Sequence, residues 1–82
     1  MENIYLPIGT IVIIKNNKEK IMITGYFCSN DKRTYEYSGC IYPYGVGDNN
    51  KSILFNHKNI KKILYVGFYN DECRDYIKKL VN

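Results

Sequence analysis

Few side chains in this 82-residue sequence are of the types that enzymes use for acid–base or nucleophilic chemistry. His57 is the only histidine, and as a general base it would need a nucleophile within hydrogen-bond reach. Cys28 and Cys40 are both in segments patterned as β-strands. The sequence contains no Gly-x-Ser-x-Gly turn, Walker loop or Gly-x-Gly-x-x-Gly fingerprint. We therefore predict that the protein is not an enzyme and uses no cofactor.

A metal site would have enough ligands here, but not the usual spacing. Zinc sites take four ligands, commonly arranged in close pairs along the chain. Cys28, Cys40, Cys73 and His57 supply four, yet they are far apart and form no Cys-x-x-Cys motif. An odd, widely spaced set of cysteines is typical of a reducing compartment. We predict reduced thiols and no metal.

Tyrosine is the side chain that this sequence supplies in excess. Nine of its residues are tyrosines, which is more than the core of so small a domain can bury. Tyrosine is enriched at protein interfaces because it buries a large area with few rotatable bonds and keeps a polar end. Tyrosines on a curved sheet can also pack half-exposed without any partner, and both interpretations are open at this point.

One aromatic segment, Tyr42-Pro43-Tyr44, is especially hard to explain as core. It adjoins the longest predicted loop, which runs over residues 43–52, and it holds two large rings where turn residues are usually small. We predict that this corner binds a partner protein with help from the next strand and turn. The predicted partner-binding residues are Tyr42, Pro43, Tyr44, Phe55 and His57.

The charge balance allows a second class of partner. Twelve Lys and Arg residues against eight Asp and Glu residues give a net charge of +4, and a basic chain can bind nucleic acid. The lysines cluster at predicted turn tips, however, where they usually form a solvated rim that protects strand edges. A small nucleic-acid-binding barrel, with aromatic rings as stacking platforms, is therefore the alternative function.

The N-terminal residues do not have the pattern of a signal peptide. The first charged residue is Glu2, and Pro7 and Gly9 interrupt the apolar residues. The longest aliphatic run, residues 11–14, is far shorter than the ~20 residues of a membrane helix. We expect a cytoplasmic protein without a membrane span.

Alternating and β-branched segments predict five strands, followed by one helix. The strands are predicted at about residues 10–15, 20–27, 34–42, 52–55 and 61–68. The helix is predicted over about residues 71–81, because Asn70 can cap it, acidic residues open it and lysines close it. Its apolar stripe must dock on the sheet, since an isolated helix of this length is marginal in water. The stripe consists of Cys73, Tyr76, Ile77, Leu80 and Val81.

Together these elements predict a single domain, residues 1–82, of the α+β class and mainly β. Five short, mostly antiparallel strands with one C-terminal helix form either a strongly bent sheet or an SH3-like small barrel. Short connections favour a meander, in which neighbours in sequence pair in the sheet. Asn16-Asn17-Lys18 predicts a tight turn, because Asn tolerates the left-handed conformation that such a turn requires. Gly25 predicts a bulge or kink, and Gly39 predicts a close approach by a neighbouring backbone or ring.

Several stretches, taken in order, resemble one known family. They are Leu6 to Val12, Lys20 to Tyr26, Tyr35 to Cys40 running into Tyr42-Pro43, Phe55 to His57, and Val66 to Phe68. The pattern is similar to that of the proteins grouped as domain of unknown function 4176, and it covers nearly the whole chain. No single stretch is specific, but their order is.

The resemblance implies a function that the residues alone do not indicate. Proteins of this kind are similar to one another in low-GC Gram-positive bacteria, where their genes lie beside those of type VII secretion and its LXG-domain toxins. An accessory role is implied, as a cytosolic chaperone or targeting adaptor that binds the helical N-terminal domain of a toxin. An immunity protein that neutralises the toxin is a further alternative. The resemblance brings no catalytic residues with it.

Overall fold

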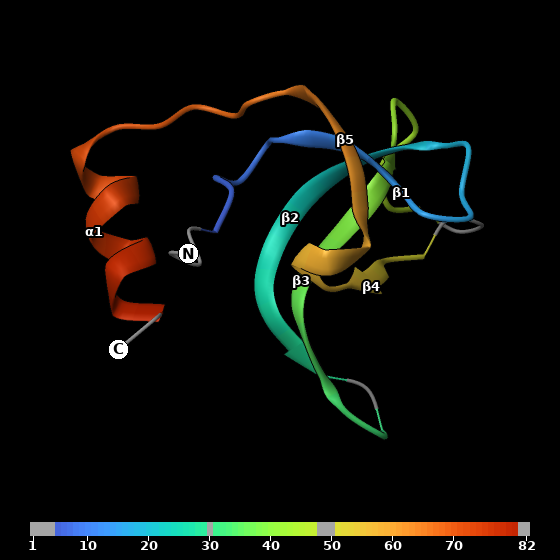
Figure 1. Ribbon diagram of the computed structural model, residues 1–82, viewed down its shortest axis with the longest axis horizontal. Helices are drawn as coiled ribbons and strands as arrows, with labels where there is room; N and C mark the ends of the chain where they lie inside the picture. The colour runs from blue at the N-terminus through green and yellow to red at the C-terminus, as the bar shows by residue number, and fades with distance from the viewer. Residues whose placement is uncertain (1–4, 30, 48–50, 81–82) are drawn as a thin grey trace.

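The computed structural model describes residues 5–29, 31–47 and 51–80. Its elements, in chain order, are β1 (Ile11–Ile14), β2 (Lys20–Ser29), β3 (Thr34–Tyr42), β4 (Ile53–Phe55), the short 3-10 helix η1 (His57–Asn59), β5 (Ile60–Tyr65) and α1 (Asp71–Leu80). The strands form one antiparallel sheet in the order β4-β3-β2-β1-β5. The predicted α+β, mainly β fold is confirmed, and the sheet is strongly bent and not closed (Figure 1).

The main differences from the sequence prediction concern β5. This strand pairs with β1 at the far side of the sheet, not with β4, so the expected meander is wrong at its last connection. The strand also ends at Tyr65 instead of residue 68, because the Gly67 N–H leaves the ladder and donates to Thr10 Oγ1 at 3.0 Å. Residue 81 of the predicted helix lies outside the described residues.

Three local predictions are confirmed and explain the course of β1 to β3. Asn16, in the turn between β1 and β2, has the left-handed φ of 63° that a tight turn requires. The β2–β3 register shifts between Ile23 and Gly25, which is the predicted bulge. A Cβ atom at Gly39 would lie 2.6 Å from Ile21 Cγ2 and 3.3 Å from the Phe55 ring, so only glycine fits there.

The hydrophobic core is built around two aromatic rings from paired strands. Tyr37 on β3 stacks on Phe55 of β4, with ring centroids 5.4 Å apart and planes 25° apart. Aliphatic side chains from β1 and β2 close around the rings. The N-terminal segment, residues 5–10, and α1 add one residue each. The buried cluster comprises Tyr5, Val12, Ile21, Ile23, Tyr37, Phe55 and Ile77.

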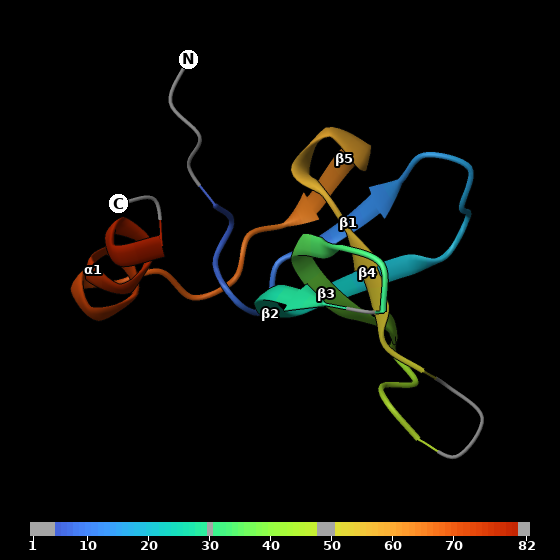
Figure 2. The same cartoon turned by 90° about the horizontal axis from the view of Figure 1, so that it is seen from below.

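α1 lies to one side of the sheet, and residues 5–9 run between the two (Figures 1 and 2). Ile77 is buried in the core, and Cys73 and Leu80 pack against it from the same stripe. Tyr76, which also belongs to the predicted stripe, is instead exposed. No helix within the described ranges has the length and apolar content needed to cross a membrane.

We predict that α1 is an integral part of the fold. Replacing Ile77 by Ala should lower the free energy of unfolding by about 2–4 kcal/mol, because it removes a side chain that is only 6% exposed and leaves a cavity. Urea unfolding followed by circular dichroism measures this loss. The control is Lys78→Ala at the neighbouring exposed position, which should change stability by less than about 0.5 kcal/mol. Equal stability of both variants would show that α1 does not pack.

Candidate functional site

The predicted corner at the end of β3 is on the surface. Tyr42 is 45% exposed and Tyr44 is 72% exposed, and Pro43 between them is exposed as well. The Tyr42–Pro43 peptide bond is cis. Gly45 closes the turn, with a left-handed φ of 75° and an N–H that donates to the Ile41 carbonyl at 2.8 Å. The turn therefore presents two aromatic rings to solvent.

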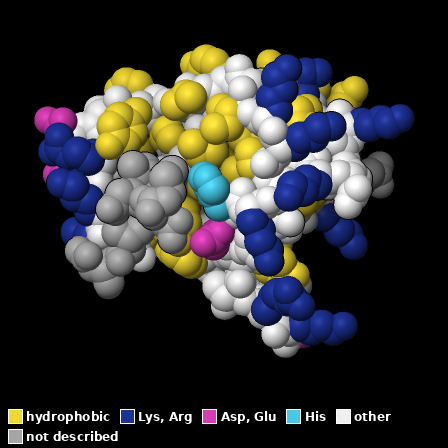
Figure 3. Space-filling view, in the orientation of Figure 1, with side chains coloured by type: hydrophobic (Ala, Val, Ile, Leu, Met, Phe, Trp, Pro, Cys, Tyr) yellow, Lys and Arg dark blue, Asp and Glu magenta, His cyan; other side chains and the backbone are white. Residues whose placement is uncertain are grey.

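The surroundings of this corner are basic. Tyr42 is the register partner of Lys20 on β2, and the β1–β2 turn adds Lys15 and Lys18, both exposed. In Figure 3, Lys and Arg side chains crowd the side of the molecule that carries the β1–β2 hairpin, opposite α1. An aromatic corner beside lysines can contact an acidic protein surface or stack on bases.

Phe55 does not belong to this surface. It is 2% exposed, and its ring is stacked on Tyr37 in the core. The β3–β4 register pairs Phe55 with Tyr37, five residues before Tyr42, which is about 16 Å along a strand. The prediction that Phe55 contacts a partner is thus contradicted by its burial. The alternating pattern predicted a strand but could not say which face is covered.

His57 lies elsewhere, in an open hollow of about 450 Å³ lined by Glu36, Asn56, His57 and Lys58. Its backbone N–H donates to Glu36 Oε1 at 2.7 Å, and Asn56 Oδ1 accepts the Glu36 N–H at 3.0 Å. Figure 3 shows the imidazole beside an acidic side chain. These bonds hold η1 against β3. The five predicted residues therefore form an exposed corner, a core residue and a separate hollow, not one surface.

The hydroxyl group of Tyr37 connects this hollow to the N-terminal segment. It accepts the Leu6 N–H at 3.0 Å and lies 2.9 Å from His57 Nδ1. The Tyr37 side chain is fully buried, and this burial raises its pKa to about 12. A neighbouring phenol, Tyr26, donates to the Leu6 carbonyl at 2.5 Å.

Tyr5 and Tyr26, whose rings contact the ring of Tyr37, also have raised pKa values. Burial raises the pKa of Tyr26 well above its usual value of 10, with smaller contributions from Cys73 and the other tyrosines. Burial also raises the pKa of Tyr5, and the Glu36 carboxylate near its hydroxyl group adds to the effect. The folded protein thus holds three phenols in their neutral form.

The described residues offer little to a metal. Cys28 and Cys73 are partly buried, Cys40 is buried, and all three are free thiols. No three His, Cys, Asp or Glu side chains gather within the described ranges.

A second surface was missed by the sequence analysis. Large apolar side chains are exposed along β5 and the segment that follows it, namely Ile63, Leu64, Tyr65, Val66, Phe68 and Tyr69. In Figure 3 hydrophobic side chains gather along the rim between α1 and β5. Near Phe68, an open groove runs between α1 and the sheet. The signal was the run of apolar residues from 63 to 66, which the sequence analysis predicted only as part of the strand over residues 61–68.

The buried phenols predict a loss of stability at alkaline pH. The phenol of Tyr37 has a higher pKa in the folded protein than in the unfolded chain. Its contribution to the free energy of unfolding is therefore fully present below about pH 10 and is lost as the pH rises toward about 12. Urea midpoints measured from pH 8 to pH 11 should fall above pH 10. Tyr37→Phe should make the fall less steep, whereas Tyr44→Phe, at an exposed ring, should keep it. Midpoints independent of pH would show that the phenols ionise freely in the fold.

Comparison with known proteins adds one finding. The family described as Domain of unknown function (DUF4176) matches residues 5–75, which include all five strands and the first half of α1. No curated protein matches the chain, and no solved structure does. The family match agrees with the resemblance carried by Leu6 to Val12, by the Tyr42-Pro43 corner and by Phe55 to His57. The chain belongs to the DUF4176 family.

Proposed function

We propose that this protein is a non-catalytic accessory factor that binds another protein through the corner formed by Tyr42, Pro43 and Tyr44. The observation that carries the proposal is the exposure of the two rings at this turn, 45% and 72%. Rings of this size, fixed on a closed turn at the end of a strand, lose little entropy when a partner covers them. The surface is of the kind that supplies the hot spots of protein interfaces.

The class of partner in this proposal comes from the resemblance to the family. It is the helical N-terminal domain of an LXG toxin exported by type VII secretion, and the protein acts in the cytosol as its chaperone or targeting adaptor. The lysines around the corner favour an acidic surface on the toxin domain. An immunity protein would instead bind the toxic C-terminal domain, so the two toxin domains tested separately distinguish these roles.

Nucleic-acid binding is the second candidate function, and one observation favours it. Lys20 is paired in register with Tyr42, so a cation and an exposed ring lie side by side, as in single-strand-binding surfaces. Such binding weakens steeply as salt is raised because phosphate contacts release counterions. Binding that depends mainly on aromatic packing does not show this steep dependence.

We predict that Tyr44→Ala weakens binding of the toxin N-terminal domain by at least about thirtyfold, as expected for loss of an interface hot spot of 2 kcal/mol or more. Because Tyr44 is exposed, the melting temperature of the Tyr44→Ala variant should stay close to that of the wild type. Isothermal titration calorimetry at low and high salt measures the affinity, and a thermal scan measures the stability.

Tyr65→Ala is the matched control, since this ring is 61% exposed on β5, away from the corner. It should bind the toxin domain as the wild type does. Equal affinities of wild type and Tyr44→Ala would exclude the corner as the contact. Salt-sensitive binding to single-stranded nucleic acid, without binding to either toxin domain, would support the second candidate function.

A further inference from the structure

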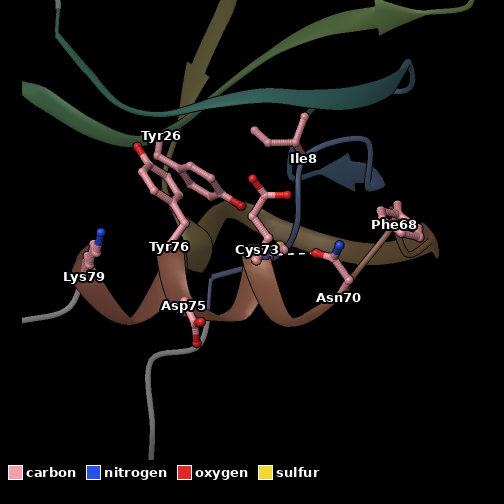
Figure 4. A pocket seen from close by; sticks show the side chains of 9 residues that line it. Ile8, Tyr26, Phe68, Asn70, Cys73, Asp75, Tyr76 and Lys79 are labelled. Atoms are coloured by element: carbon pink, nitrogen blue, oxygen red, sulfur yellow. Dashed lines mark hydrogen bonds between the residues drawn. The ribbon is translucent and has the colours of Figure 1, made fainter.

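α1 and the sheet leave an open groove of about 720 Å³ between them, which we call the helix groove. Its lining includes the large side chains of Ile8, Tyr26, Phe68 and Tyr76 and the charged side chains of Glu72 and Lys79. Figure 4 shows Tyr26 and Tyr76 close together at one end and Phe68 at the other. Ile8 points into the space from the N-terminal segment, Asp75 points to the other side of α1, and Lys79 lies beyond Tyr76 at the same end. The helix groove is therefore mainly apolar.

Both walls of the helix groove are held by buried contacts. The Gly67 N–H donates to Thr10 Oγ1, and both residues are buried, so the segment that carries Phe68 is fixed to the N-terminal segment. A Cβ atom at Gly67 would collide with the Ile8 carbonyl oxygen, which shows how closely the two segments approach. Ile77 anchors α1 from the opposite side. The groove is thus pre-formed in the folded protein.

The side chains at the mouth of the helix groove are unusually exposed for their size. Phe68 is 79% exposed, Tyr76 is 53% exposed and Ile8 is 46% exposed. Exposed apolar side chains that adjoin a concave surface are typical of interaction sites. Covering these three side chains would remove a large apolar area from water, most of it from the Phe68 and Tyr76 rings.

The backbone hydrogen bonds of the walls indicate whether the helix groove can bind a strand or a helix. The N–H groups of Leu6, Gly9 and Thr10 donate to Tyr37 Oη, the Ile23 carbonyl and the Pro7 carbonyl, and the backbone of α1 is bonded within the helix. Strand addition needs a row of free backbone groups, whereas these N–H groups of the N-terminal segment, and those in the interior of α1, are already bonded. A helix satisfies its own backbone and offers side chains at positions i, i+3, i+4 and i+7. The walls therefore suit a helix.

The charged side chains of α1 indicate which charged residue the bound helix should carry beside its apolar face. Arg74 Nη1 pairs with Asp71 at 3.0 Å, and Arg74 Nη2 pairs with Asp75 at 3.2 Å. Glu72 lines the helix groove and makes no ion pair within the described part of the chain. An occupant with a Lys or Arg next to its apolar face would pair with Glu72.

We propose that the helix groove binds one amphipathic α-helix of a partner protein. Its apolar face packs on Ile8, Phe68 and Tyr76, and a basic residue beside that face pairs with Glu72. The proposal rests on the proposed function in that the occupant belongs to a protein partner, but its surface is separate from the Tyr42-Pro43-Tyr44 corner, which lies across the sheet from α1 (Figure 1).

Three synthetic peptides of about 18 residues, or five turns of helix, test the proposal with the full-length isotope-labelled protein. The first has a leucine face flanked by lysines, the second has the same face flanked by glutamates, and the third has the composition of the first with its leucines scattered. The lysine peptide should shift the amide resonances of Ile8, Phe68 and Tyr76. Weaker binding by the glutamate peptide, and weaker still by the scattered one, is expected.

Two variants make the assignment specific. Phe68→Ala should weaken binding of the lysine peptide at least about tenfold, which corresponds to the loss of one well-packed aromatic contact. Glu72→Gln should reduce the preference for the lysine over the glutamate peptide. Tyr65→Ala, at another exposed ring that lies outside the groove lining, should bind as the wild type does. Equal binding by all three peptides, or resonance shifts confined to β5 or to the corner, would overturn the proposal.

The toxin domain separates this proposal from the proposed function. Tyr44→Ala could lose binding of the toxin domain while Phe68→Ala and Tyr76→Ala both retain it. In that case the proposed function stands, and the toxin domain does not bind in the helix groove. If the lysine peptide occupies the groove but neither toxin domain binds, the groove proposal stands and the proposed function is wrong. Loss of binding of the toxin domain with Tyr44→Ala and also with Phe68→Ala, each at an unchanged melting temperature, would support both.

Discussion

The fold depends on one buried polar atom, the hydroxyl oxygen of Tyr37. Its ring is fully buried against Phe55, so the hydroxyl group must find partners inside the protein or impose the cost of an unpaired polar group. Leu6 and His57 are those partners. In binding them, Tyr37 fixes the N-terminal segment on one side and η1 on the other. η1 in turn redirects the chain from β4 to β5, and the N-terminal segment becomes a wall of the helix groove.

The two edges of the sheet explain why its exposed apolar residues are better suited to side-chain packing than to strand addition. β4 has only three residues. The β1–β5 register shifts twice within β5, and Lys61 and Lys62 lie in the same strand. Bulges and lysines are common means of preventing edge-to-edge pairing. A partner is therefore expected to contact projecting rings, at the corner or at the helix groove, and not to extend the sheet.

The candidate site could be predicted only in part from the sequence. The exposure of Tyr42 and Tyr44 followed from their place beside a turn, where local composition is informative. Phe55 was misplaced because an apolar residue in a short strand gives no sign of which face is covered, and the pairing that buries it comes from Tyr37 on another strand. The helix groove could not be predicted at all. Its residues come from the N-terminal segment, β2, the segment after β5 and α1.

The sequence by itself determined the local features: five strands and a helix close to their observed bounds, the left-handed turn at Asn16, the bulge beside Gly25, and membership of the family. These depend on conformational preferences of a few adjacent residues. Only the tertiary structure decided that β5 pairs with β1, that Phe55 is core while Phe68 is exposed, and that Tyr76 faces a groove while Ile77 is buried. Each of these depends on contacts between residues distant in sequence, because burial is a property of the assembled surface and not of the residue.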